Sequence, residues 1–175
     1  MPITEEQLET LFAFIDGHPA AQIDSRLTLP ITADNFKERF NVEMIPIVRR
    51  LDLDDDRTVT KSFFLLNDWQ TRATTDGKIF LNVFGNSAAI EVVTDDSDRI
   101  KFVLCAFSQP ETPDEKTLAS MVLVTLTKVL LPADDVENFL RKLPAVGNMI
   151  VGDMEFSLTK FNGLTLILAA KEGVL

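Results

Sequence analysis

The side chains that most often serve nucleophilic or metal-assisted catalysis are scarce in this chain. Its 175 residues include one histidine, His18, and one cysteine, Cys105. His18 precedes a proline and has neither a second histidine nor the glutamate of an HExxH helix, so it lacks the partners of a zinc site or of a nucleophile. We interpret it as a loop histidine, solvated or structurally bonded. Cys105 stands in an apolar run that predicts a small buried side chain, and a lone cysteine excludes an intrachain disulfide.

Carboxylates offer the remaining chemistry. Acidic residues gather in two connections between predicted strands, and an antiparallel meander would bring both connections to the same end of the sheet. Several carboxylates there would suit Ca²⁺, which prefers hard oxygen ligands, or a carboxylate- or metal-dependent enzyme. The alternative is a set of solvated acidic turns. The candidate metal ligands are Asp68, Asp76, Asp95, Asp96 and Asp98.

Aromatic residues form the second candidate site. The strands expected near residues 79–84 and 100–107 are apolar on both faces, whereas an antiparallel sheet commonly leaves one face solvated. One face is expected to pack against a long helix. The other must be covered by the N-terminal helix, by a second copy of the chain or by an apolar ligand. The candidate partner-binding residues are Trp69, Phe80, Phe84 and Phe107.

Four helices are predicted from their start signals, apolar spacing and stop signals. A capping box at Thr4–Gln7 begins a helix that ends near residue 16. A second helix begins near residue 32 and is expected to end or kink near residue 45, because Pro46 disfavours helix in the preceding residue. Thr112-Pro113 begins a long helix over residues 112–131. A short helix near residues 134–143 is expected to end before Pro144.

Alternating apolar residues and turn residues predict the strands. The expected meander comprises residues 58–66, 78–84, 88–94 and 99–107, joined by short turns. Asn162-Gly163 between two alternating runs predicts a C-terminal hairpin, because a type I′ turn needs positive φ at both central residues. The fold class is therefore α+β: an antiparallel meander sheet plus a C-terminal hairpin, packed by a long central helix and shorter helices. We expect one domain over residues 1–175, with residues 1–31 an N-terminal helix and connector and residues 32–172 the main body.

Composition restricts the partners. There are 17 Lys and Arg against 27 Asp and Glu, a net charge of −10. Such a chain gains little from counterion release, so we expect no nucleic-acid partner. The most apolar stretch is shorter than the roughly 20 residues that a bilayer requires, so we expect no membrane insertion. The N-terminus lacks the features of a signal peptide, which predicts a cytoplasmic protein, or an exported one if Met1 is not the natural start.

The element order resembles that of a known group of proteins. A helix at residues 36–41 precedes the strands, and a helix pair ending with residues 136–143 precedes the hairpin at residues 156–168. This order, over residues 32–171, is similar to that of small bacterial α+β proteins, often exported or lipid-anchored, whose function is not assigned. No signal sequence or lipobox cysteine is present here. A weaker resemblance, in size, charge and element order, is to the acidic dimeric chaperones of type III secretion, although this chain lacks an evident C-terminal helix. Neither resemblance implies catalytic residues.

The sequence therefore predicts a non-catalytic binding or protein-interaction domain without a cofactor. Its partner would be another protein or a second copy of the chain, as in a homodimer. The alternatives are a partner-binding dimer similar to the type III secretion chaperones and a carboxylate- or metal-dependent enzyme that uses the acidic end of the sheet.

Overall fold

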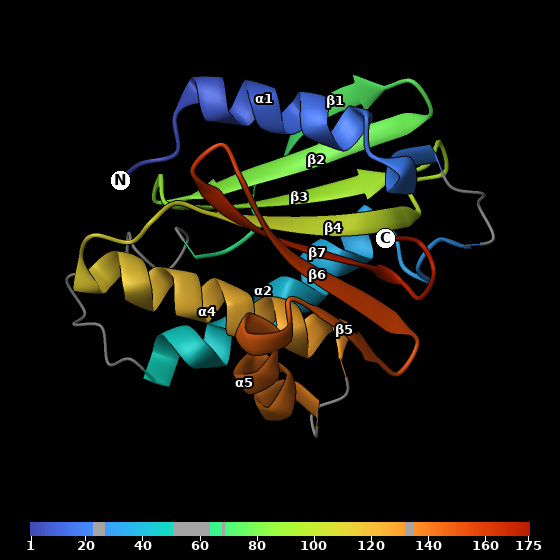
Figure 1. Cartoon of the computed structure of the whole chain (residues 1–175). Helices are drawn as coiled ribbons and strands as arrows, with labels where there is room; N and C mark the ends of the chain where they lie inside the picture. The colour runs from blue at the N-terminus through green and yellow to red at the C-terminus, as the bar shows by residue number, and fades with distance from the viewer. Residues whose placement is uncertain (23–26, 51–63, 68, 132–134) are drawn as a thin grey trace.

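The computed structural model describes residues 1–22, 27–50, 64–67, 69–131 and 135–175. In these residues a single antiparallel sheet of seven strands is packed between two layers of helix (Figure 1). The α+β fold class is thereby confirmed. The strand order is β1-β2-β3-β4-β7-β6-β5, a meander of four strands followed by the last three in reverse order. The strands are β1 (Gln70–Thr74), β2 (Gly77–Phe84), β3 (Ala88–Thr94), β4 (Ile100–Phe107), β5 (Asn148–Val151), β6 (Met154–Phe161) and β7 (Leu164–Lys171).

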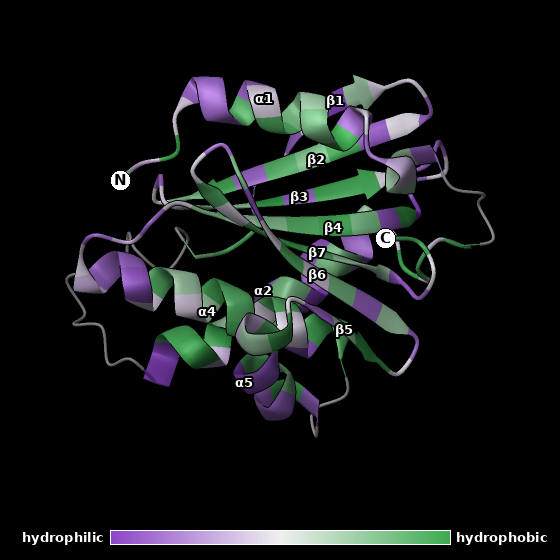
Figure 2. Ribbon diagram, viewed as in Figure 1, coloured by the Kyte–Doolittle hydropathy of each residue, from purple (hydrophilic) through white to green (hydrophobic). Residues whose placement is uncertain are grey.

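Helices cover the two faces of the sheet. Three of them, α2 (Ala33–Arg50), α4 (Pro113–Leu130) and α5 (Val136–Val146), lie on one face. The other face is covered by α1 (Glu5–Asp16) and a short 3₁₀ helix, η1 (Pro19–Gln22). Figure 2 shows hydrophobic residues along the central strands between these layers. The strands that are apolar on both faces are thus covered within one chain, and no second copy is needed to bury them.

Short-range signals account for most of the predicted elements. Both capping boxes form, with Thr4 and Gln7 at α1 and with Thr112 and Glu115 at α4. The hairpin turn has φ of 48° at Asn162 and 79° at Gly163, as a type I′ turn requires. These side chains satisfy backbone N–H groups or adopt turn geometry locally, so their effect does not depend on distant contacts.

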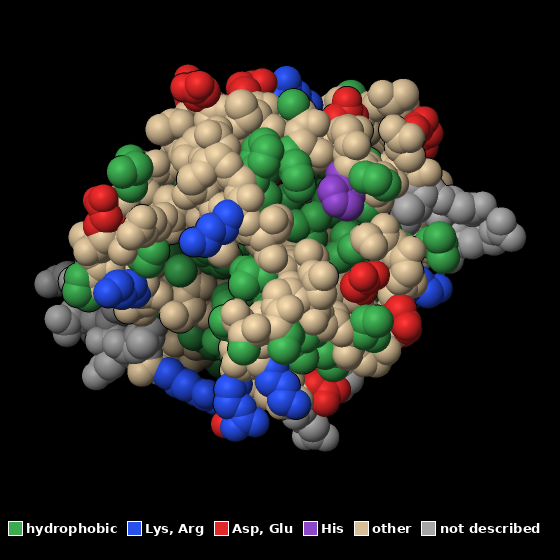
Figure 3. All heavy atoms as spheres, viewed as in Figure 1, with side chains coloured by type: hydrophobic (Ala, Val, Ile, Leu, Met, Phe, Trp, Pro, Cys, Tyr) green, Lys and Arg blue, Asp and Glu red, His purple; other side chains and the backbone are tan. Residues whose placement is uncertain are grey.

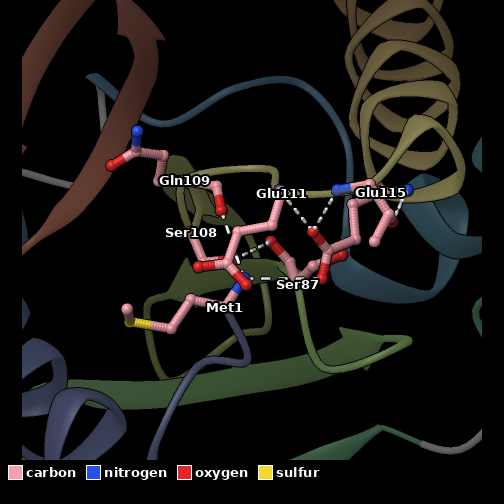
Figure 4. Close-up of polar contacts among 7 residues, drawn as sticks. Met1, Ser87, Ser108, Gln109, Glu111 and Glu115 are labelled. Atoms are coloured by element: carbon pink, nitrogen blue, oxygen red, sulfur yellow. Dashed lines mark hydrogen bonds and ion pairs between the residues drawn. The ribbon is translucent and has the colours of Figure 1, made fainter.

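A polar network that includes Met1 lies at the start of α4 (Figure 4). The Glu115 carboxylate accepts hydrogen bonds from the backbone N–H groups of Glu111, at 2.6 Å, and Thr112, at 3.2 Å. These two hydrogen bonds lower the pKa of Glu115. The N-terminal ammonium of Met1 lies 3.3 Å from a Glu111 oxygen and 3.5 Å from a Glu115 oxygen. The polar network therefore joins the α1 side of the sheet to the helix on the opposite side.

The expected end of a helix before Pro144 is wrong, and of the two alternatives at Pro46, an end or a kink, the helix end is excluded. Helix α2 continues through Pro46 to Arg50, and α5 continues through Pro144 to Val146. A proline removes one helical hydrogen bond, to the carbonyl four residues earlier. In α2 that carbonyl belongs to Val42, a residue on the exposed side of the helix. Burial of Met44 and Val48 on the core face stabilises the helix on either side of the proline.

Two strand predictions are corrected. In the described residues the meander begins with β1 at Gln70–Thr74. Residues 64–66 of the strand predicted at residues 58–66 are not in a strand, and residues 58–63 lie outside the described residues. Strand β5 was not predicted, because its four residues give too short a pattern to recognise. Both are edge strands, which lack the long apolar runs of the central strands. Among the described residues, no helix has the length and apolar character needed to cross a membrane.

Gly77 allows β2 and β3 to approach closely. A Cβ at this position would lie 1.8 Å from the carbonyl oxygen of Thr94. We expect Gly77→Ala to lower the free energy of unfolding by about 3 kcal/mol, because backbone atoms must move to admit the methyl group. Chemical denaturation measures the change. Gly17→Ala is the control: its nearest neighbour would be 3.3 Å away, and we expect a change under about 1 kcal/mol. Equal stability of the two variants would contradict this close approach.

Candidate functional site

An apolar pocket opens between α4, α5 and the sheet. It has a volume of about 310 Å³, at the lower end of the range for ligand pockets. Hydrophobic side chains are visible in the hollow between α4 and the β6–β7 hairpin in Figure 3. The lining residues are Phe107, Ala119, Ser120, Leu123, Phe139, Leu140, Leu143, Pro144, Leu158, Thr165 and Ile167. We call this the α4/α5 pocket.

The pocket follows from the side chains that α4 and α5 present to each other. On α4, large buried residues such as Leu118 and Val122 pack into the core, whereas Ala119 and Ser120 are small and leave space. On α5, Phe139 packs against Phe156 with ring centroids 4.4 Å apart. This aromatic contact packs α5 against the sheet, and Phe139 also lines the pocket.

The lining residues suit binding and not catalysis. Only Ser120 and Thr165 have polar side chains, and no lining residue is titratable in the physiological range. The Ser120 hydroxyl donates a hydrogen bond to the backbone oxygen of Lys116 at 2.9 Å, as is common for serine within a helix. The pocket therefore offers mainly apolar surface to a ligand, and its described lining includes no acidic, basic, histidine or cysteine side chain.

The four predicted partner-binding residues lie in three different places. Phe107 lines the α4/α5 pocket and is 8% exposed. Trp69 and Phe80 are half-buried near the β1 edge of the sheet and contact each other edge-to-face, with centroids 5.9 Å apart. Phe84 is completely buried against Phe40 and belongs to the core of the chain. The four residues therefore do not form one surface.

The acidic residues are partly gathered, but with cations among them. Asp76, Asp95 and Asp96 line a hollow of about 280 Å³ together with Arg99 and Lys101. Asp95 accepts hydrogen bonds from the backbone N–H of Ser97 and Arg99, and its other oxygen pairs with the Arg99 guanidinium at 3.2 Å. Asp95 is thus engaged in the loop itself.

The fourth described aspartate of that prediction, Asp98, pairs with Lys78 at 3.2 Å. Asp68 lies outside the described residues. Within the described part of the chain, no three Asp, Glu, His or Cys side chains are placed to hold a metal ion. The described aspartates of this prediction therefore form no metal-binding group with other described residues, and lysine and arginine side chains lie among them.

His18 and Cys105 have the structural roles expected from the sequence. His18 Nδ1 accepts a hydrogen bond from the backbone N–H of Ala20 at 3.0 Å, and its ring lies between Phe14 and Phe102. Burial lowers the pKa of His18. Cys105 is completely buried in the core, and burial raises the pKa of its thiol. Neither residue is placed to act as a nucleophile or base.

The sequence prediction missed Glu91. This residue is at the middle of β3, completely buried, and neither carboxylate oxygen has a hydrogen-bond partner in the described structure. Burial raises its pKa from 4.5 to about 8, and Arg72 opposes this shift. Alternation along β3 places Glu91 on the same face as Ala89 and Val93, beneath α1. The available signal was one charged residue within the strand Ala-Ala-Ile-Glu-Val-Val-Thr.

Comparison of the chain with protein-family models, curated proteins and solved structures gave no match. The resemblances to small bacterial proteins and to type III secretion chaperones remain predictions, and the α4/α5 pocket is the candidate site that the residues themselves support.

Proposed function

We propose that this chain is a non-catalytic interaction domain that holds apolar side chains of a partner protein in the α4/α5 pocket. The observation that carries the proposal is the pocket itself, an apolar hollow whose described lining includes no titratable group. A preformed pocket of this kind lowers the ordering cost of binding, since its side chains are already held by the core.

The neighbouring edge of the sheet favours a protein over a small molecule as partner. Strand β5 is the last strand of the sheet and pairs only with β6 among the described strands. Ile150 on β5 is 58% exposed, and Val146 at the end of α5 is 60% exposed. A free strand edge can accept a strand from another chain, with main-chain hydrogen bonds giving affinity and nearby pockets giving specificity.

Filling the pocket tests the proposal. A neutral apolar dye such as Nile red is expected to bind the wild-type protein with increased fluorescence, and Ala119→Trp is expected to weaken that binding at least fivefold by occupying the hollow. Ala145→Trp is the matched control, because Ala145 is exposed on α5 and does not line the pocket. Equal dye binding by the two variants would show that the pocket is not the apolar binding site.

The same variants distinguish a second copy of the chain from another partner. Light scattering at several concentrations measures the solution mass, which is 19.6 kDa for one chain. If the partner is a second copy, wild type and Ala145→Trp will show twice this mass and Ala119→Trp will show a larger monomer fraction. A dimer that Ala119→Trp leaves unchanged would place the self-interface elsewhere.

A further inference from the structure

A second hollow lies on the other side of α4, between α4 and α2. It is more open than the α4/α5 pocket and has a volume of about 500 Å³. Its lining residues are Ile47 and Arg50 from α2, and Lys116, Thr117, Ser120, Met121, Val124 and Lys128 from α4. We call it the α2/α4 groove. Ser120 lines both the groove and the pocket, so only the width of α4 separates the two.

The charge of the groove is opposite to that of the whole protein. Arg50, Lys116 and Lys128 line it, and no acidic residue is among its described lining residues. The chain as a whole has 27 acidic and 17 basic residues. None of the three groove cations forms an ion pair with any described residue.

The groove combines these cations with an apolar floor. Ile47 and Val124 are partly exposed there, and Met121 is buried between them and the core. Along α4, Lys116, Ser120, Val124 and Lys128 follow at intervals of four residues, so they form one ridge. At 1.5 Å per residue, the two lysines are about 18 Å apart along the helix. The two lysines thus lie at either end of an apolar strip. The strip is long enough to contact several residues of a bound segment.

We propose that the segment bound by this domain is acidic as well as apolar, and that its carboxylates lie against Arg50, Lys116 and Lys128. This inference rests on the proposed function, because a segment that places an apolar side chain in the α4/α5 pocket and crosses α4 at Ser120 enters the groove. Charge complementarity identifies the chemistry of the occupant. Its carboxylates would meet cations that form no ion pair with a described residue, and its aliphatic side chains would meet Ile47 and Val124.

Three labelled peptides provide the probe. They share leucines at helical spacing i, i+3, i+4 and i+7, and their other positions alternate alanine with glutamate, glutamine or lysine. Fluorescence anisotropy at low salt is expected to show at least tenfold tighter binding of the glutamate peptide than of the lysine peptide. Net charge alone predicts the opposite order, since the protein carries −10. The preference is expected to diminish as salt screens the charges.

Two double variants test whether the preference for the glutamate peptide depends on the groove lysines. Lys116→Glu/Lys128→Glu reverses the groove charges, and Lys160→Glu/Lys171→Glu makes the same change of charge on the β6–β7 hairpin. Both variants have the same net charge, so non-specific repulsion is the same in both. We expect the groove variant to lose at least tenfold in affinity for the glutamate peptide and the hairpin variant to lose less than threefold.

The outcomes separate this inference from the proposed function. Equal losses in the two double variants, tighter binding of the lysine peptide, or no binding of any peptide would overturn the acidic-segment proposal. The groove variant should still bind Nile red as wild type does, because the pocket is unchanged. If dye binding depends on Ala119 while the peptides show no charge preference, the pocket proposal stands and only the groove proposal fails.

Discussion

Glu91→Leu is expected to stabilise the protein, and the gain should increase with pH. The Glu91 carboxyl is completely buried between Leu81 and Leu104 of the neighbouring strands, and its oxygens have no hydrogen-bond partner in the described structure. A buried polar group without a partner costs about 1–3 kcal/mol even when uncharged. Leucine has a similar size and matches the apolar surroundings beneath α1, so the cost is removed.

The sign of the pH dependence follows from the direction of the shift. Burial raises the pKa of Glu91 from 4.5 to about 8, so between these pH values the folded chain binds more protons than the unfolded chain. The contribution of Glu91 to the free energy of unfolding is therefore fully present below pH 4.5. It falls as the pH rises from 4.5 to 8 and is lost above pH 8. The full difference corresponds to about 5 kcal/mol. Arg72 favours the ionised form of Glu91 and therefore reduces this loss of stability.

Urea denaturation of wild type, Glu91→Gln and Glu91→Leu at pH 5, 7 and 9 measures this effect. The difference between wild type and either variant isolates Glu91 from other titrating groups, such as His18 and Glu115, whose pKa values are lowered. We expect the free energy of unfolding of each variant, measured relative to wild type, to increase by several kcal/mol between pH 5 and pH 9. A difference that does not change with pH would mean that Glu91 is solvated or paired in solution.

Hydrogen exchange shows which part of the structure is destabilised when Glu91 ionises. Glu91 lies on the sheet face covered by α1, and the apolar side chains of Leu11 and Ile15 pack on that face. We expect α1 amides in the wild-type protein to exchange faster at pH 9 than at pH 6, after correction for intrinsic rates. Glu91→Gln should remove this additional change, because the amide is uncharged at both pH values.

Phe84→Asp is expected to prevent folding. The Phe84 ring is completely buried, with its centroid 5.8 Å from that of Phe40 on α2. Loss of a buried phenylalanine costs about 3–5 kcal/mol. An ionised carboxylate in the same place adds a desolvation penalty of several kcal/mol. Together these costs exceed the stability of many domains of this size, which is about 5–15 kcal/mol.

Circular dichroism and thermal denaturation test this expectation, with Phe80→Asp as the comparison. Phe80 is on the same strand but only half-buried, so we expect this variant to fold with reduced stability. A folded Phe84→Asp protein with weakened self-association would instead show that Phe84 is part of an interface.

Local patterns in the sequence were sufficient to predict most of the elements, since caps, alternation and the Asn-Gly turn act over a few residues. They predicted α1, α4, three strands of the meander, the C-terminal hairpin, and the structural roles of His18 and Cys105. They failed where distant contacts compete with local preference. Helix α2 passes through Pro46 because its buried face continues along the core, and the short edge strands depend on their neighbours for pairing.

The candidate sites were determined by the tertiary structure. Of the predicted site residues, Phe107 reaches the α4/α5 pocket. Arg99 and Lys101 line the same hollow as three of the aspartates that were expected to bind calcium. The sequence by itself determined the α+β class, the apolar strands and the net charge. Only packing decided which small residues leave a pocket, which cations share a groove and that Glu91 is buried, because each depends on side chains that are distant in the chain and adjacent in space.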